Sequence, residues 1–166
     1  MSSLTTPDQA ATALFGVMPC VVTQATLDEY GLVIADGQVP RLTRELLILN
    51  LFWVVSVLDA TLSDKDRDRV FTALLHRVTE AWALELGLPD DLRAGFEDDL
   101  RHRHTQYAEV VQNGGVQVSV LTEAAGAIEA EEIVPEAARP MLLALLIDLD
   151  PSGDIGETVD EIDLAG

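Results

Sequence analysis

Residues 40–62 read PRLTRELLILNLFWVVSVLDATL, and this stretch decides the fold. On a helical wheel of about 100° per residue, its polar side chains gather on one narrow arc, and nearly every other residue from Leu46 onward is apolar. The arc consists of Arg41, Glu45, Ser56 and Asp59. A helix that is hydrophobic almost all round usually forms the buried centre of a bundle. Asn50 falls on the side opposite the arc, so we expect it to be buried with a hydrogen-bond partner.

The segments on both sides of this stretch also show helical periodicity, with Gly and Pro marking their ends. Thr6 is an expected N-cap for the first helix, and Ser63 or Asp64 for the helix that follows residue 62. Residues 116–120 alternate with period two, but they run directly into sequence that favours a helix. Besides the central one, the expected helices cover about residues 7–16, 19–30, 64–86, 91–112, 118–133 and 141–147.

The predicted fold class is therefore all-α, a single compact bundle of five to seven helices with an acidic C-terminal extension. We expect residues 1–147 to form the helical bundle domain. Residues 148–166 hold seven acidic residues and no basic one, together with Pro151, Gly153 and Gly156. This composition predicts an ordered turn followed by a frayed acidic tail.

The charge balance excludes several classes of function. The 166 residues include 29 acidic and 10 basic side chains, for a formal net charge of −19, yet 48% of the chain is hydrophobic. So high an apolar content argues against a disordered acidic chain. Nucleic-acid binding and docking on anionic lipid both require clustered Lys and Arg, so neither partner is expected. Residues 84–166 carry 19 of the acidic residues, and the fitting partners are cations or the basic surface of a protein.

Three features that the sequence lacks indicate where in the cell the protein is located. Cys20 is the only cysteine, which excludes an intrachain disulfide and predicts a buried, inert thiol. The first residues show no basic segment before an apolar one, so no signal peptide is expected and the cytoplasm is the default location. The longest uncharged run that is rich in apolar residues, residues 46–58, is too short to cross a bilayer.

A metal-binding hypothesis rests on residues 148–155, which read DLDPSGDI and resemble the start of an EF-hand calcium loop. The ligands would be oxygen atoms of Asp148, Asp150, Ser152 and Asp154, whose alternation directs several oxygens toward one centre. Position twelve of such a loop is a Glu, whereas this chain has Val159 there. The alternative is an Asp/Pro/Ser/Gly turn that closes the last helix. No other cofactor is predicted.

Arg103 is the most unusual placement in the chain. It falls near the middle of the apolar stripe of the helix expected over residues 91–112. An arginine there extends its head group to solvent, pairs with a buried acid, or faces a pocket or partner. Glu45 and Asp59 are the natural acids for it. The alternative is a recognition arginine in a cleft or a dimer interface.

Catalytic and transition-metal patterns are largely missing. The pairs His76/Glu80 and Asp98/His102 have i,i+4 spacing, which is typical of solvated ion pairs on a helix surface. The chain has no phosphate-binding Gly-rich loop, no Cys-x-x-Cys, no Gly-x-Ser-x-Gly and no His-Glu-x-x-His. We therefore expect a non-enzymatic protein.

The leading hypothesis is a cytoplasmic helical interaction protein, an adaptor, regulator or assembly factor, that binds a protein partner with a basic surface. Apolar and acidic residues alternate near the C-terminus, a pattern suited to a basic-rimmed groove. The residues proposed to interact are Arg103, Asp160, Glu161, Ile162, Asp163 and Leu164.

Two alternative functions and one assembly state remain open. The first alternative is a calcium-binding module that uses residues 148–159. The second is a helical metal-dependent or small-ligand enzyme with its site near Arg103 and the histidines. We also expect a homodimer, because the narrow stripe on residues 91–112, with Phe52 and Trp53, leaves apolar surface that a small bundle does not fully cover.

Overall fold

Helix α3 (Val39–Thr61) runs through the middle of the computed structural model, which describes residues 5–164. Its apolar side chains are buried nearly all round, including Leu47, Ile48 and Leu51, each with no exposed surface. Helices α4, α5, α6 and α8 all pack against it. The sequence predicted a buried central helix here, and the structure confirms it.

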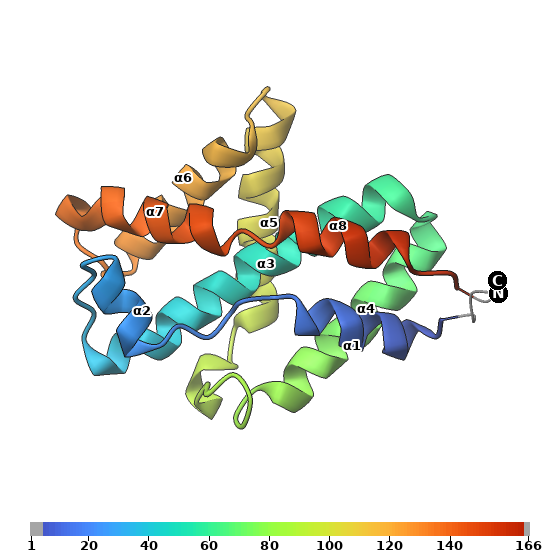
Figure 1. The fold of residues 1–166 in the computed structure, drawn as a ribbon, viewed down its shortest axis with the longest axis horizontal. Coiled ribbons are helices and arrows are strands. Elements are labelled where there is room, and N and C mark those ends of the chain that lie inside the picture. The colour runs from blue at the N-terminus through green and yellow to red at the C-terminus, as the bar shows by residue number, and fades with distance from the viewer. Residues whose placement is uncertain (1–4, 165–166) are drawn as a thin grey trace.

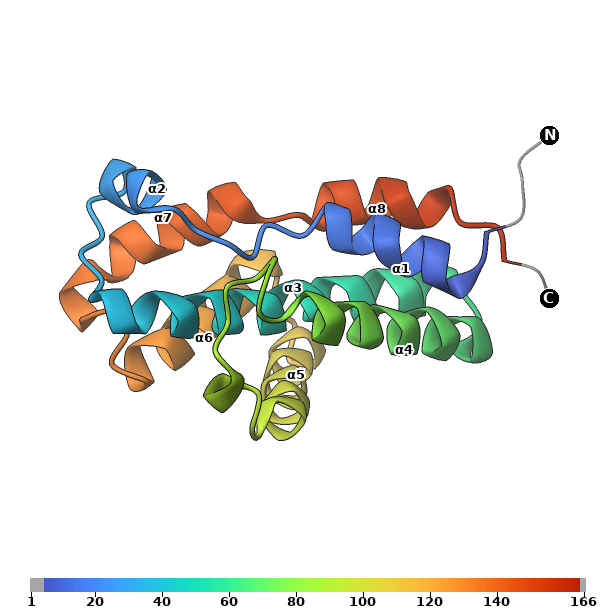
Figure 2. The ribbon, with the colours of Figure 1, turned by 90° about the horizontal axis from the view of Figure 1, so that it is seen from below.

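The described residues form an all-helical fold, as predicted from the sequence. Its elements are α1 (Pro7–Gly16), α2 (Gln24–Glu29), η1 (Asp36–Gln38), α3, α4 (Asp64–Ala81), η2 (Asp90–Leu92), α5 (Phe96–Gln112), α6 (Gln117–Ala130), η3 (Glu136–Ala138), α7 (Arg139–Leu149) and α8 (Ser152–Asp160), where η marks a short 3-10 helix. Helices α7 and α8 lie end to end along one side of α3, and α5 crosses the other side (Figures 1 and 2). Within residues 5–164, no helix is both long and apolar enough to span a membrane.

Side-chain caps define the helix starts that the sequence indicated. The Thr6 hydroxyl accepts a hydrogen bond from the Gln9 backbone N–H at 3.1 Å, and the Gln9 side chain accepts one from the Thr6 backbone. Ser63 caps α4 by accepting from the Asp66 backbone N–H at 3.2 Å. These bonds satisfy amide groups that the first helical turn leaves without partners.

The second expected helix was too long at its start. It was predicted over residues 19–30, whereas α2 begins only at Gln24. Thr23 is extended and accepts a hydrogen bond from the Thr26 backbone N–H at 3.2 Å, so it caps the helix. A β-conformation N-cap ends helical geometry on its N-terminal side, which leaves the preceding residues as a connection.

The C-terminal segment differs most from the prediction. Residues 152–160 form α8 rather than a frayed tail, and α8 packs against α3 and α1. Ile155 and Val159 are almost completely buried, and Ile162 is half-buried on the same side. The glycines at 153 and 156 lower helix propensity, but burial of this apolar face outweighs that cost.

A further tertiary contact joins the two ends of the described chain. The Thr5 backbone N–H donates to the Asp163 carbonyl at 2.7 Å, so the described ends of the chain lie side by side. Phe52 and Trp53 are only 6% and 7% exposed, so the aromatic pair offers little of the uncovered apolar surface expected of it. The homodimer stays a prediction.

Candidate functional site

A buried ionic cluster joins α3, α5 and α6. The Arg103 guanidinium on α5 donates from Nε to Glu45 Oε2 and from Nη2 to Glu45 Oε1, both at 3.3 Å. Nη2 also lies 3.4 Å from Oε1 of Glu131, at the end of α6. The Glu45 side chain is 2% exposed and that of Arg103 14%. The predicted pairing with Glu45 is confirmed, and Arg103 acts here as a structural partner of buried acid.

The other acid considered for Arg103 was the wrong one. Asp59 pairs with Arg67, across the turn between α3 and α4. Asp59 lies near the C-terminal end of α3, almost four turns beyond Glu45. Both acids lie on the same face of α3, so the position at which α5 crosses α3 decides which of them contacts Arg103. That position is set by the tertiary structure.

Two further polar side chains of α5, Tyr107 and His104, are turned toward the interior. The Tyr107 hydroxyl is buried and has no hydrogen-bond partner among the described residues. Burial raises the pKa of Tyr107 and also that of Glu45, although the hydrogen bond from Arg103 opposes the rise at Glu45. His104 Nε2 lies 3.0 Å from the Ile48 carbonyl, and burial lowers the pKa of its imidazole.

Asn50 has the partners that its buried position requires. Its Nδ2 donates to the Pro19 carbonyl at 3.3 Å and to Cys20 Sγ at 3.4 Å. Burial raises the pKa of the Cys20 thiol to about 11. The thiol is thus buried and protonated at neutral pH, as expected of an inert cysteine.

The predicted calcium ligands lie at the junction of α7 and α8, where they make other contacts. Asp148 accepts from the Tyr30 hydroxyl, and Asp150 accepts from the Gln117 amide. Gln117 Nε2 also donates to Ser152 Oγ at 2.8 Å. These bonds tie α2 and α6 to the junction.

The junction contains a groove but no closed loop. Asp148, Asp150 and Asp154 line a groove of about 390 Å³ together with residues 16–19. However, residues 152–159 belong to α8, and helical backbone cannot wrap around one centre as a calcium loop does. Among the described residues, no group of three or more His, Cys, Asp or Glu side chains is placed to hold a metal ion.

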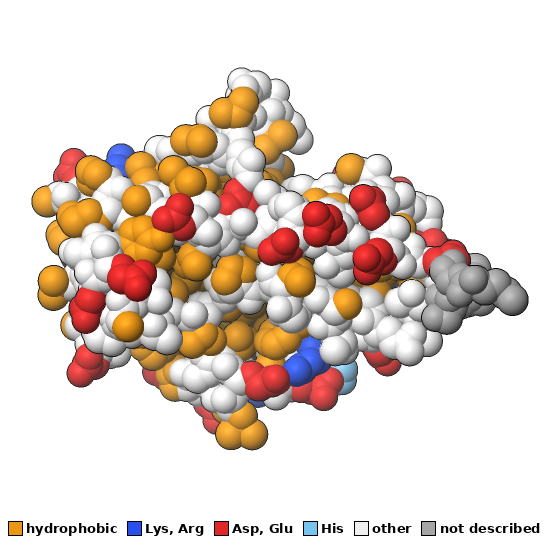
Figure 3. Space-filling view, viewed as in Figure 1, with side chains coloured by type: hydrophobic (Ala, Val, Ile, Leu, Met, Phe, Trp, Pro, Cys, Tyr) orange, Lys and Arg blue, Asp and Glu red, His pale blue; other side chains and the backbone are white. Residues whose placement is uncertain are grey.

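The predicted interacting tail divides into two faces. Asp160, Glu161 and Asp163 are exposed, whereas Ile162 and Leu164 are half-buried against the core. The exposed acidic residues of α8 and of the segment after it form one surface, which we call the α8 acidic face. Its members are Asp154, Glu157, Asp160, Glu161 and Asp163. Figure 3 shows acidic side chains gathered over α8. None of the five forms an ion pair within residues 5–164.

The histidines do not assemble into a site in the described structure. His76 lies 3.2 Å from Glu80, the surface pair that the i,i+4 spacing predicted. His102 is exposed, whereas His104 on the same helix is turned into the core against the Phe52 ring.

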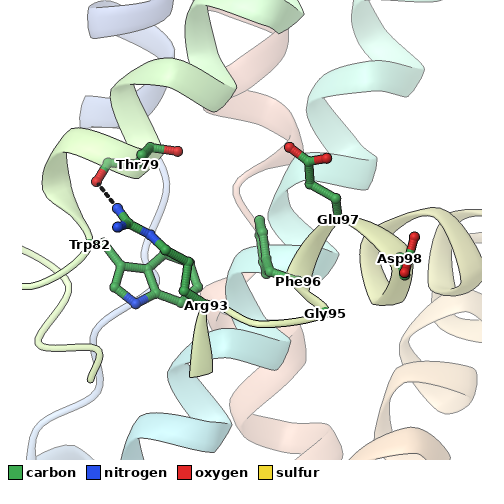
Figure 4. Close-up of a pocket in the computed structure, with 7 residues that line it drawn as sticks. All are labelled: Thr79, Trp82, Arg93, Gly95, Phe96, Glu97 and Asp98. Atoms are coloured by element: carbon green, nitrogen blue, oxygen red, sulfur yellow. Dashed lines mark hydrogen bonds between the residues drawn. The ribbon is translucent and has the colours of Figure 1, made fainter. Parts of the chain in front are cut away.

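A pocket that sequence reasoning missed lies where the end of α4 meets the start of α5 (Figure 4). Its volume is about 510 Å³, and Trp82 and Phe96 meet edge to face in its wall, with ring centroids 5.1 Å apart. Arg93 Nη2 donates to the Thr79 carbonyl at 2.9 Å. The glycine at position 95 is the only sequence signal for this turn, and in the structure its φ of +75° redirects the chain into α5. Nothing in the sequence places Trp82 beside Gly95. The charged side chains of Arg93, Glu97 and Asp98 line this pocket beside the buried rings of Trp82 and Phe96. Its lining contains no nucleophilic side chain paired with a base.

Comparison of the chain with models of protein families, with curated protein sequences and with solved structures finds no match.

Proposed function

We propose that this chain is a non-enzymatic helical interaction protein of the cytoplasm, an adaptor, regulator or assembly factor, that binds the basic surface of a protein partner. The observation that carries the proposal is the α8 acidic face. Five carboxylates stand on α8 and the three residues after it, all exposed, and none is neutralised by an ion pair within the described chain. Such a field attracts cationic partners and orients their approach.

The distribution of the basic residues supports the same function. Most arginines already pair with acids of this chain, among them Arg44 with Asp99 at 2.7 Å and Arg77 with Glu85 at 2.7 Å. No Lys or Arg follows Arg139 in the sequence. The α8 acidic face therefore has no cation of its own nearby in sequence, and a partner would supply the countercharge.

The apolar side of the tail takes no part in this proposal. Ile162 and Leu164 pack against the core, so the segment would meet a partner as a folded surface rather than by inserting into a groove. Deleting residues 148–166 would also remove Ile155 and Val159 from the core, so loss of binding after truncation would only report unfolding.

Charge neutralisation on the folded protein is the sharper experiment. The variant D154N/E157Q/E161Q removes three charges from the α8 acidic face, and D90N/D91N/E97Q removes three exposed charges elsewhere. Binding of an oligolysine peptide is measured by fluorescence anisotropy at low and physiological salt. We expect the first variant to bind about tenfold more weakly with a shallower salt dependence, and the second to remain close to wild type. Equal losses in both variants would show that only net charge matters and would contradict the proposal.

A further inference from the structure

The α5–α6 hairpin projects from the body of the protein, and its tip exposes apolar side chains (Figures 1 and 3). Val111 in the last turn of α5, and Val116 and Val118 at the start of α6, are 49%, 67% and 54% exposed. We call these three residues the valine tip. Isolated exposed valines are ordinary, but three of them within eight residues of one projecting turn form a local apolar surface.

The valine tip is held in a defined shape. The Gly115 backbone N–H donates to the Val110 carbonyl at 2.9 Å, and Gly114 has a φ of +86° that L-residues seldom adopt. A Cβ atom at Gly115 would lie 2.5 Å from the Val110 carbonyl oxygen, so the backbone closes tightly there. Gln117, between the two α6 valines, is hydrogen-bonded to Ser152 at 2.8 Å. A pre-shaped surface loses little conformational entropy on binding.

Only acidic charge surrounds the valine tip in the sequence. Residues 105–138 contain no Lys, Arg or His, and the exposed Glu109 and Glu123 lie two residues before Val111 and five residues after Val118. The Gln117 contact also places the tip beside the α7–α8 junction, from which the α8 acidic face begins. An apolar centre with an acidic surround complements a partner that has an apolar centre and a basic surround.

We propose that the valine tip is the docking surface for a basic amphipathic helix of the partner protein. The helix would place its apolar stripe on Val111, Val116 and Val118, and its Lys and Arg side chains toward Glu109, Glu123 and the α8 acidic face. This inference rests on the proposed function and adds the apolar anchor that the half-buried Ile162 and Leu164 do not supply. A second copy of this chain would bring like charges together, and an anionic membrane would be repelled by the same carboxylates.

The test uses the full chain and two peptides of equal positive charge. One is a Leu/Lys peptide with its leucines on a single helical face, and the other is a Ser/Lys peptide without an apolar face. The variant V111S/V116S/V118S removes the apolar tip at exposed positions, and V21S/V33S/L84S removes three exposed apolar side chains elsewhere. Circular dichroism checks that both variants fold, and light scattering gives the oligomeric state.

We expect wild type to prefer the Leu/Lys peptide, the tip variant to lose about tenfold in affinity for it, and the control variant to be unchanged. If both peptides bind equally and the tip variant matches wild type, the valine tip is not the docking surface. The proposed binding of a basic partner would still stand in that case. If neither peptide binds, the proposed function fails as well. A wild-type dimer that the tip variant converts to a monomer would overturn the inference by showing that the tip contacts a second copy. Binding of the wild type to anionic vesicles through the tip would equally overturn it.

Discussion

Arg103 on α5 contacts both carboxylate oxygens of Glu45 on α3 at 3.3 Å, inside a part of the protein from which water is largely excluded. Removing one member of a buried pair leaves the other charge without compensation, which costs about 3–5 kcal/mol. We therefore expect Arg103→Met to lower the free energy of unfolding in urea by about 3 kcal/mol. The double variant R103M/E45L should be more stable than R103M alone, because no unpaired charge remains buried.

Arg101 provides the control for that experiment. It pairs with Asp98 at 3.2 Å, but both side chains are more than three-quarters exposed. Arg101→Met should change the free energy of unfolding by less than about 0.5 kcal/mol. Equal effects of the two arginine substitutions would refute a special role for the buried pair.

His104 should make stability depend on pH. Burial lowers the pKa of its imidazole in the folded state, so the unfolded chain takes up a proton first on acidification. Its contribution to stability is fully present above the ordinary histidine pKa of about 6.5 and is lost as the pH falls below that value. His104→Gln, which keeps a donor near the Ile48 carbonyl, should flatten the pH dependence of the melting temperature in this range.

His102 on the same helix is exposed, so His102→Gln is the matched control. Glu45 acts with the opposite sign, because burial raises its pKa and its protonation on acidification favours the folded state. The difference between wild type and the His104 variant isolates the histidine from that effect. Identical pH profiles for wild type and the His104 variant would show that the His104 imidazole does not contribute to the pH dependence of stability.

Cys20 should react only when the protein opens. Its thiol is 2% exposed, and burial raises its pKa to about 11, so little thiolate is present at neutral pH. We expect alkylation by iodoacetamide to be slow in buffer and rapid in urea, which can be followed by mass because Cys20 is the only cysteine. Comparable rates in both conditions would contradict the buried position.

Ile155 tests whether α8 belongs to the core. Its side chain has no exposed surface, so Ile155→Ala should lower the free energy of unfolding by about 2–4 kcal/mol. Asp160→Asn, at an exposed position of the same helix, should have little effect. A frayed tail would instead tolerate both substitutions equally.

Two glycines near the hairpin should respond in opposite directions to the same change. Gly115→Ala would bring a Cβ atom within 2.5 Å of the Val110 carbonyl oxygen, so we expect it to destabilise the protein. Gly126 lies inside α6 with nothing within 4 Å of its Cβ position, so Gly126→Ala should stabilise by about 0.5–1 kcal/mol. Thermal melting curves of the two variants check both signs.

The sequence by itself determined the central helix and most of the helices around it. The apolar circumference of residues 46–58 predicts burial whatever lies beside it, and Thr6 and Ser63 mark helix starts through local hydrogen bonds. The burial of Asn50 also followed from its position on the wheel. These features depend on periodicity and on neighbours within one helical turn, and both can be read from a linear chain.

Only the tertiary structure decided which residues meet across helices. It selected Glu45 over Asp59 as the partner of Arg103, and it brought in Glu131, which no local pattern indicates. It also turned the glycine-containing segment after Pro151 into α8, because α1 and α3 present an apolar surface that buries Ile155. Helix propensity is a matter of tenths of a kcal/mol per residue, whereas burying one such side chain is worth about 1.5–3 kcal/mol. Where the two conflict, packing decides, and packing exists only in three dimensions.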